Sequence, residues 1–224
     1  MGRQPTHCLS ILRFLKITSY YYADQCMEDS KVTIILEAAR KRFAHYGLSK
    51  TTMNEIAADI GMSKASLYYY FPDKENLFVA VIEQDFDEFV KTIDSLISKP
   101  SKASFKLKKY IHMRNQLLNK LLTLAKIERS TVSEVLKPVF SEHRQKLLAK
   151  EKELIAKILE LGIKEGEFIK FNVNNYADLF ISALVGIRAQ SVGVTFIYDS
   201  DLEDRINRQA TLLVDVFLKS IQNV

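Results

Sequence analysis

The chain has 224 residues, of which 47% are apolar, and this is enough for the core of one large domain or two small ones. Its 7 Gly and 4 Pro favour long helices over a turn-rich β architecture, and no apolar run approaches the roughly 20 residues that a membrane span needs. The net charge is +5, but residues 29–89 hold 7 basic and 10 acidic side chains, so overall basicity is no argument for nucleic-acid binding.

Residues 1–26 form a leader that contains both cysteines of the chain. Arg13 and Lys16 interrupt its apolar stretch, so it does not have the pattern of a secretory signal. We expect an upstream extension before a natural start at Met27, and a peripheral helix is the alternative. The two cysteines have no disulfide or metal-type spacing, which favours a reducing cytoplasm.

Four helices are predicted in residues 29–98. Apolar residues recur from Ser30 at helical spacing and end at Gly47, which suits a left-handed helix stop. The segment "TTMNEIAADIGM" begins a second helix, with Thr52 and Glu55 at capping-box spacing. The next two helices start at their own cap residues.

Ser63 is predicted to cap a short third helix that ends near Phe71, because Pro72 disfavours helical geometry in the residue before it. Asp73 is predicted to cap a longer fourth helix that continues to about Ser98. The second and third helices, separated by "DIGMS", have the pattern of a helix-turn-helix braced by the first helix. In that motif the second helix of the pair enters the major groove of DNA.

The third helix contains "SKASLYYYF", in which three successive tyrosines cannot all face one core. Leu67 and Phe71 are predicted to hold the helix to its neighbours. The outer surface then carries Ser63, Lys64, Ser66, Tyr68 and Tyr69. An outward tyrosine hydroxyl beside a lysine is typical of a phosphate contact. The alternative, a packed tyrosine with its hydroxyl in water, is weaker for Tyr68 and Tyr69 and is favoured for Tyr70.

Residues 51–78, "TTMNEIAADIGMSKASLYYYFPDKENLF", resemble the DNA-binding domain of the TetR family of bacterial transcriptional regulators. The likeness rests on the threonine before the motif, "IA…GMS", "LYYYF" and "KENLF". The resemblance implies a set of DNA-contacting residues, namely Thr52, Ser63, Lys64, Ala65, Ser66, Tyr68, Tyr69 and Lys74. Two residues depart from the family pattern, Ala65 where glycine is frequent and Tyr70 where histidine is common.

After a polar break at residues 98–104, further helices are predicted over 105–127, from Pro138 to about Lys164, over 174–193 and over 201–221. The last two are so apolar that they favour a two-fold interface, a four-helix bundle made by two subunits. Val216 and Phe217 are expected in its seam, and the alternative places both helices in a monomer core.

The resemblance implies a homodimer through this helix pair and a small-molecule pocket inside the helical domain. Candidate ligand-binding residues, chosen by position and size, are Tyr110, Met113, Arg114, Leu117, Phe140, Phe168 and Phe180. Ordinary core packing is the alternative for each of them. The expected ligand is apolar or amphipathic, and anionic if Arg114 points inward.

The predicted fold class is all-α, with a three-helix helix-turn-helix DNA-binding domain in residues 29–89 (motif about 52–71) and a helical regulatory and dimerisation domain in residues 90–224. We expect a cytoplasmic homodimeric repressor, released from a palindromic double-stranded DNA operator by a small molecule. The alternative is a DNA-binding regulator whose helical domain binds a protein partner or no ligand. The histidines, at positions 7, 45, 112 and 143, have no metal-site or nucleophile pattern, so no enzyme, metal or cofactor is expected, and no membrane association.

Overall fold

The structure is a computed structural model that describes residues 30–125, 137–194 and 200–223. The predicted leader lies outside these ranges. Every regular element within them is a helix, which confirms the all-α prediction, and an isolated antiparallel bridge joins Phe168 to Gln222. None of the described helices combines the length and the apolar character that crossing a membrane requires.

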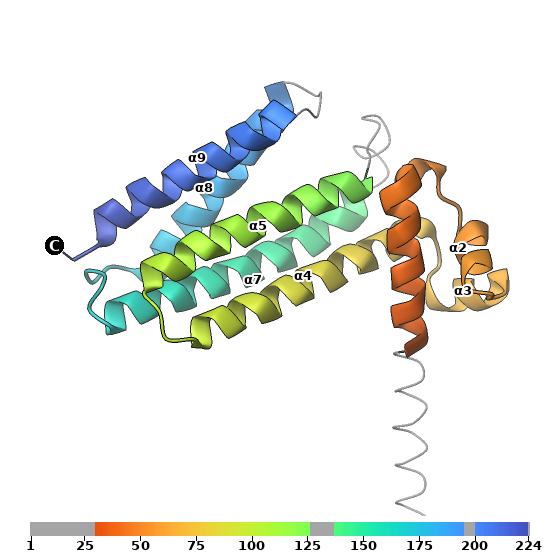
Figure 1. Cartoon of the computed structure of the whole chain (residues 1–224), viewed down its shortest axis with the longest axis horizontal. Helices are drawn as coiled ribbons and strands as arrows, with labels where there is room; N and C mark the ends of the chain where they lie inside the picture. Colours follow the sequence, from red (N-terminus) through yellow and green to blue (C-terminus); the bar gives the residue numbers. More distant parts are fainter. Residues whose placement is uncertain (1–29, 126–136, 195–199, 224) are drawn as a thin grey trace, which may run out of the picture.

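Three helices lie at one end of the molecule (Figure 1). They are a helix over residues 30–50, α2 at Met53–Asp59 and α3 at Lys64–Tyr70. α2 and α3 are joined by a tight turn in which Gly61 has a φ of 63°, a left-handed conformation that other residues rarely adopt.

Local capping fixes where α2 and α3 begin. Thr52 caps α2 through the predicted capping box, because its hydroxyl accepts from the Glu55 amide (3.3 Å) and the Glu55 carboxylate accepts from the Thr52 amide (2.9 Å). Ser63 caps α3 by accepting from the Ser66 amide at 3.1 Å. Both predicted cap residues are confirmed.

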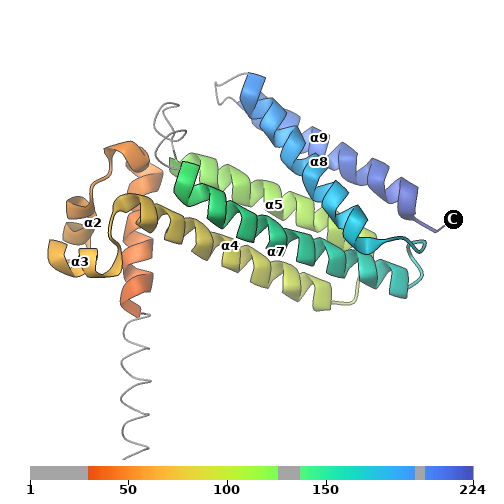
Figure 2. The same cartoon turned by 180° about the vertical axis from the view of Figure 1, so that it is seen from behind.

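The remaining helices form a larger helical body. α4 (Lys74–Ser98) leaves the small end and continues beside α5 (Ala103–Ala125) and α7 (Lys137–Lys164). α8 (Val173–Val194) and α9 (Ser200–Ile221) lie side by side as a further layer, seen from both sides in Figures 1 and 2. The predicted helix starts and ends agree with these bounds to within a few residues.

Two hydrophobic cores meet along α4. The smaller core joins the 30–50 helix, α2, α3 and the start of α4, with Phe43 and Phe78 edge to face at 5.1 Å between ring centroids. The larger core joins the rest of α4 to α5, α7, α8 and α9. α4 is therefore a rigid connection between the two ends of the molecule.

The end of α7 and the turn that follows it pack against the start of α5. A Cβ on Gly162 would lie 2.1 Å from the Phe168 ring, so this close approach requires glycine. The Glu167 carboxylate then accepts from the Ala103 amide at 2.6 Å and caps the start of α5.

Polar groups meet at the junction of the two cores. Asp85 on α4 is buried and contacts Arg40 of the 30–50 helix and, at 3.0 Å, Lys120 of α5. Burial lowers the pKa of Arg40, and burial with the nearby Arg40 charge lowers the pKa of Lys120. Three helices thus share one buried carboxylate.

Candidate functional site

α3 presents most of its side chains to solvent. Leu67 is its only buried residue in the structure and anchors it to the smaller core, as predicted. Ser63, Lys64, Ala65 and Ser66 are exposed, and Tyr69 is 76% exposed. Leu67 holds α3 to the core together with the partly buried Tyr70 and Phe71, and the exposed aromatic and basic side chains are left available to enter a groove.

The outward side chains of α3 are ordered by contacts among themselves. The Lys64 ammonium lies 5.5 Å from the Tyr68 ring centroid, a cation–π arrangement. Tyr69 meets Tyr70 edge to face at 5.1 Å between ring centroids, and Tyr70 is half-buried because it packs against the smaller core. The predicted difference between Tyr69 and Tyr70 therefore agrees with their exposure.

Two predicted DNA contacts already have partners within the protein. The exposed Thr52 hydroxyl donates to the Glu55 carboxylate at 2.8 Å. The Lys74 ammonium donates to the carbonyl oxygens of Leu48 (3.0 Å), Ser49 (3.3 Å) and Thr51 (3.3 Å). Both residues lie at the ends of helices beside α3, where they fix the helices' relative positions.

Sequence reasoning missed Lys31. It lines a groove of about 570 Å³ together with the turn before α3 and with Ser63, Ala65, Ser66, Tyr69 and Tyr70. Lys31 precedes Ser63 by 32 residues, so only the packing of the 30–50 helix brings it to this surface. In the sequence it is a single lysine at the start of an amphipathic helix, with nothing that marks it as part of this surface.

The 30–50 helix is tied to α2 by charge. The Arg42 guanidinium donates to both carboxylate oxygens of Asp59, at 2.5 and 2.7 Å. These hydrogen bonds raise the pKa of Arg42. The same contact lowers the pKa of Asp59, and hydrogen bonds from Thr52 lower the pKa of Glu55. Both acids of α2 are therefore engaged, Asp59 by the 30–50 helix and Glu55 by the residue that caps α2.

The predicted ligand-binding residues lie mainly in the larger core. Tyr110, Phe168 and Phe180 are buried, and Met113 and Leu117 are partly buried against the core. The side chain of Phe140 is outside the described part of the structure. Ordinary packing thus accounts for the apolar members of the set.

Arg114 does point inward. Its guanidinium and the Tyr110 hydroxyl both donate to Glu151 on α7, the hydroxyl at 2.5 Å. Burial, reinforced by the Glu151 charge, raises the pKa of Tyr110 well above its ordinary value. Burial by itself lowers the pKa of Arg114, but the Glu151 carboxylate reverses this and raises it. The Arg114 guanidinium is therefore already paired with a buried carboxylate.

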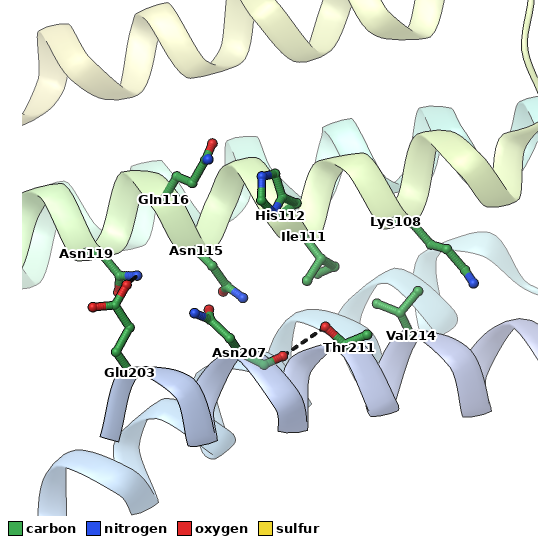
Figure 3. A pocket seen from close by; sticks show the side chains of 10 residues that line it. All are labelled: Lys108, Ile111, His112, Asn115, Gln116, Asn119, Glu203, Asn207, Thr211 and Val214. Atoms are coloured by element: carbon green, nitrogen blue, oxygen red, sulfur yellow. Dashed lines mark hydrogen bonds between the residues drawn. The ribbon is translucent and has the colours of Figure 1, made fainter. Parts of the chain in front are cut away.

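A cavity of about 390 Å³ lies elsewhere, between α5 and α9 (Figure 3). None of the six predicted ligand residues whose side chains the structure describes lines it. Its lining is Lys108, Ile111, His112, Asn115, Gln116, Asn119, Glu203, Asn207, Thr211 and Val214. Its volume is within the range of small-molecule sites.

α8 and α9 carry exposed apolar side chains on their outer surface. Leu179, Leu212 and Val216 are 63%, 63% and 58% exposed. Phe217, expected in the seam beside Val216, is instead 7% exposed, because its ring packs against Phe180. The seam prediction was therefore wrong for Phe217, which belongs to the chain's own core.

Both the N-terminal and the C-terminal part of the chain match known protein families. Residues 35–81 match the family model "Bacterial regulatory proteins, tetR family", and residues 99–223 match "QacR-like protein, C-terminal region". A crystal structure of a transcriptional regulator from Cytophaga hutchinsonii is 39% identical, with a TM-score of 0.80, and the match covers 86% of this chain and 99% of that one.

Two curated regulators are also similar. The uncharacterised HTH-type regulator YfiR of Bacillus subtilis is 27% identical over 63% of this chain and 69% of its own length. The HTH-type regulator RutR of Escherichia coli is 43% identical over 58 residues, 26% of this chain and 27% of its own. The match to RutR therefore spans about a quarter of that protein.

Proposed function

Because the chain belongs to the TetR family of helix-turn-helix transcriptional regulators, we propose that it is a cytoplasmic homodimeric repressor that a small molecule releases from a palindromic DNA operator. The observation that supports DNA binding most directly is the surface of α3, where Leu67 is buried and every other side chain except the half-buried Tyr70 is exposed. The relatives and the family are regulators and not enzymes.

The proposed interface divides its contacts between base edges and phosphates. Lys64, Ala65 and Ser66, in the first turn of α3, would face base edges in the major groove, because that end of a recognition helix enters most deeply. Tyr68, Tyr69 and Thr52 would contact phosphate oxygens and set the docking register. Ser63 caps the helix, and Lys74 positions it.

A two-fold arrangement through α8 and α9 would present two copies of α3. The exposed Leu179, Leu212 and Val216 support this interface, since exposed apolar side chains that gather on two neighbouring helices are typical of an interaction surface. Tyr176 and Phe180 on α8 contact Phe217 on α9. These contacts place Leu179 of α8 and Val216 of α9 at a similar height along the helix pair. Two half-sites should then be one helical turn apart or a multiple of it, about 10–10.5 bp.

Release by a ligand requires tighter binding to the DNA-incompetent form, because equal affinity for both forms shifts no equilibrium. The helical body contains a cavity, which supports a regulatory role for it. The apolar or amphipathic ligand expected from the sequence stays a prediction for the region around Tyr110 and Phe180.

Selection of bound DNA from a random library tests the proposal. We expect an inverted repeat to be enriched, and Lys64→Ala to abolish or relax its enrichment while the variant keeps wild-type circular dichroism. Enrichment of no motif, or of a single half-site without its repeat, would contradict a dimeric operator-binding repressor.

A further inference from the structure

The cavity between α5 and α9 is closed at both ends by polar contacts that join the two helices. At one end the Lys108 ammonium lies 2.8 Å from Asp215, and at the other the Asn119 amide donates to Glu203. Lys108 and Asn119 are eleven positions apart on α5, a length of about 16 Å. The space between the two contacts is a slot of defined length.

The middle of this slot carries two free carboxamides. Asn115 on α5 is only 8% exposed, yet its side chain has no hydrogen-bond partner in the described part of the chain and points into the space between the helices (Figure 3). Asn207 faces it from α9, and its side chain likewise has no partner within the described ranges. Asn115 is largely buried and Asn207 is half-buried, so a molecule in the cavity can displace solvent at both carboxamides and supply the hydrogen bonds that the protein does not.

The two amides determine the chemistry of that molecule. Each carboxamide offers an acceptor oxygen and N–H donors, so the matching group must both donate and accept hydrogen bonds. The Lys108 ammonium is paired with Asp215 and the Glu203 carboxylate already accepts from the Asn119 amide, so neither charged group is left without a partner at the middle of the slot. Ile111 and Val214 are buried beneath the amides and form an apolar surface for a ring or short chain.

We propose that this cavity binds a small uncharged molecule that carries a carboxamide-like group on an apolar frame. The inference rests on the proposed regulation by a small molecule and names the ligand class and its site. It differs from the apolar or amphipathic ligand and the core residues expected from the sequence.

The chain contains no tryptophan, so the fluorescence of a single introduced tryptophan reports only on the surroundings of that residue. Thr211→Trp puts the reporter at an exposed position of the cavity lining, and Phe105→Trp, on α5 but outside that lining, is the matched control. Each full-length variant is titrated with benzamide, benzoate, benzylammonium and toluene, which share one ring and differ only in the attached group. Fluorescence is measured without DNA.

We expect benzamide to change the fluorescence of Thr211→Trp saturably, with a Kd at least about tenfold below those of the other three compounds. The control should not respond. Adding Asn115→Leu should weaken benzamide binding about tenfold, and Asn207→Leu, on the opposite helix, provides a second test if the first variant does not fold. Folding is checked by circular dichroism.

Equal or tighter binding of toluene, benzoate or benzylammonium would overturn the proposed ligand class. Benzamide binding that survives both leucine substitutions, or no response to any compound at millimolar concentration, would overturn the site. Operator affinity is measured separately: a bound benzamide that leaves it unchanged keeps the site but removes its part in regulation. Failure of DNA binding itself would leave the fluorescence result intact.

Discussion

The three protons of the Lys74 ammonium all have acceptors, because the group donates to three carbonyl oxygens at the end of the 30–50 helix and the start of α2. A phosphate contact by Lys74 would require at least one of these bonds to be released. Among the described residues Lys64 makes no such bonds, and its ammonium lies over the Tyr68 ring. Two lysines near the same helix therefore differ in what they can do for DNA.

Lys64 and Tyr69 should respond differently to substitution. Lys64→Ala removes a proposed base contact, so we expect a loss of about 1–3 kcal/mol in operator binding and relaxed preference at one base pair per half-site. Tyr69→Phe removes only a hydroxyl directed at phosphate, so binding should weaken by a similar factor for every sequence. Affinities for the selected operator and its single-base variants are compared at fixed salt.

The opposite pattern would place α3 differently. If Tyr69→Phe altered base preference and Lys64→Ala did not, the helix would be rotated about its axis relative to the proposed interface. Unchanged binding by both variants would assign the tyrosine run to packing alone. Both variants must keep wild-type circular dichroism for the comparison to hold.

Successive residues of α5 connect the cavity with the DNA-binding end. Asn119 contacts Glu203 of α9, and its neighbour Lys120 contacts Asp85 of α4, which in turn contacts Arg40 of the 30–50 helix. A small rotation or shift of α5 would therefore act on both ends of the molecule. This is the physical connection through which a ligand beside α9 could alter the position of α3.

Asp85→Asn tests the central element of this connection. The change leaves Arg40 and Lys120 close together without the carboxylate between them, so the free energy of unfolding should fall by about 1–3 kcal/mol, a value that allows for solvent screening of the half-exposed Lys120. Asp87→Asn, exposed on the same helix, is the control and should have little effect. Urea denaturation measures both, and equal stabilities of the two variants would show that the Asp85 contacts contribute little.

Helix limits were predictable because their signals are local. Ser63, Asp73 and the Thr52–Glu55 pair act within one turn, and each caps the helix that the sequence predicted. The cavity was not predictable, since it depends on how α5 packs against a helix about 90 residues away. Lys31 was missed for the same reason.

At the scale of the whole molecule, the inward and outward sides of α9 could not be separated from its sequence. Val216 and Phe217 are about 100° apart on the helix, and both lie near the apolar stripe. The rings of Tyr176 and Phe180 on α8 decide between them by contacting Phe217. Val216 is thereby left on the outer surface with Leu179 and Leu212.

This difference makes the proposed dimer testable with neighbouring substitutions. Val216→Asp places a charge on the outer surface, so the monomer should stay folded, but a dimer that buries this position should dissociate because the carboxylate would lie there without a partner. Phe217→Asp introduces the same charge into the monomer core, and we expect it to unfold the chain, not merely to separate subunits. Sedimentation measures subunit association and circular dichroism measures folding. A folded Val216→Asp variant that remains dimeric would place the interface on another surface, and a similar result for Leu212→Asp would exclude the outer side of α9 altogether.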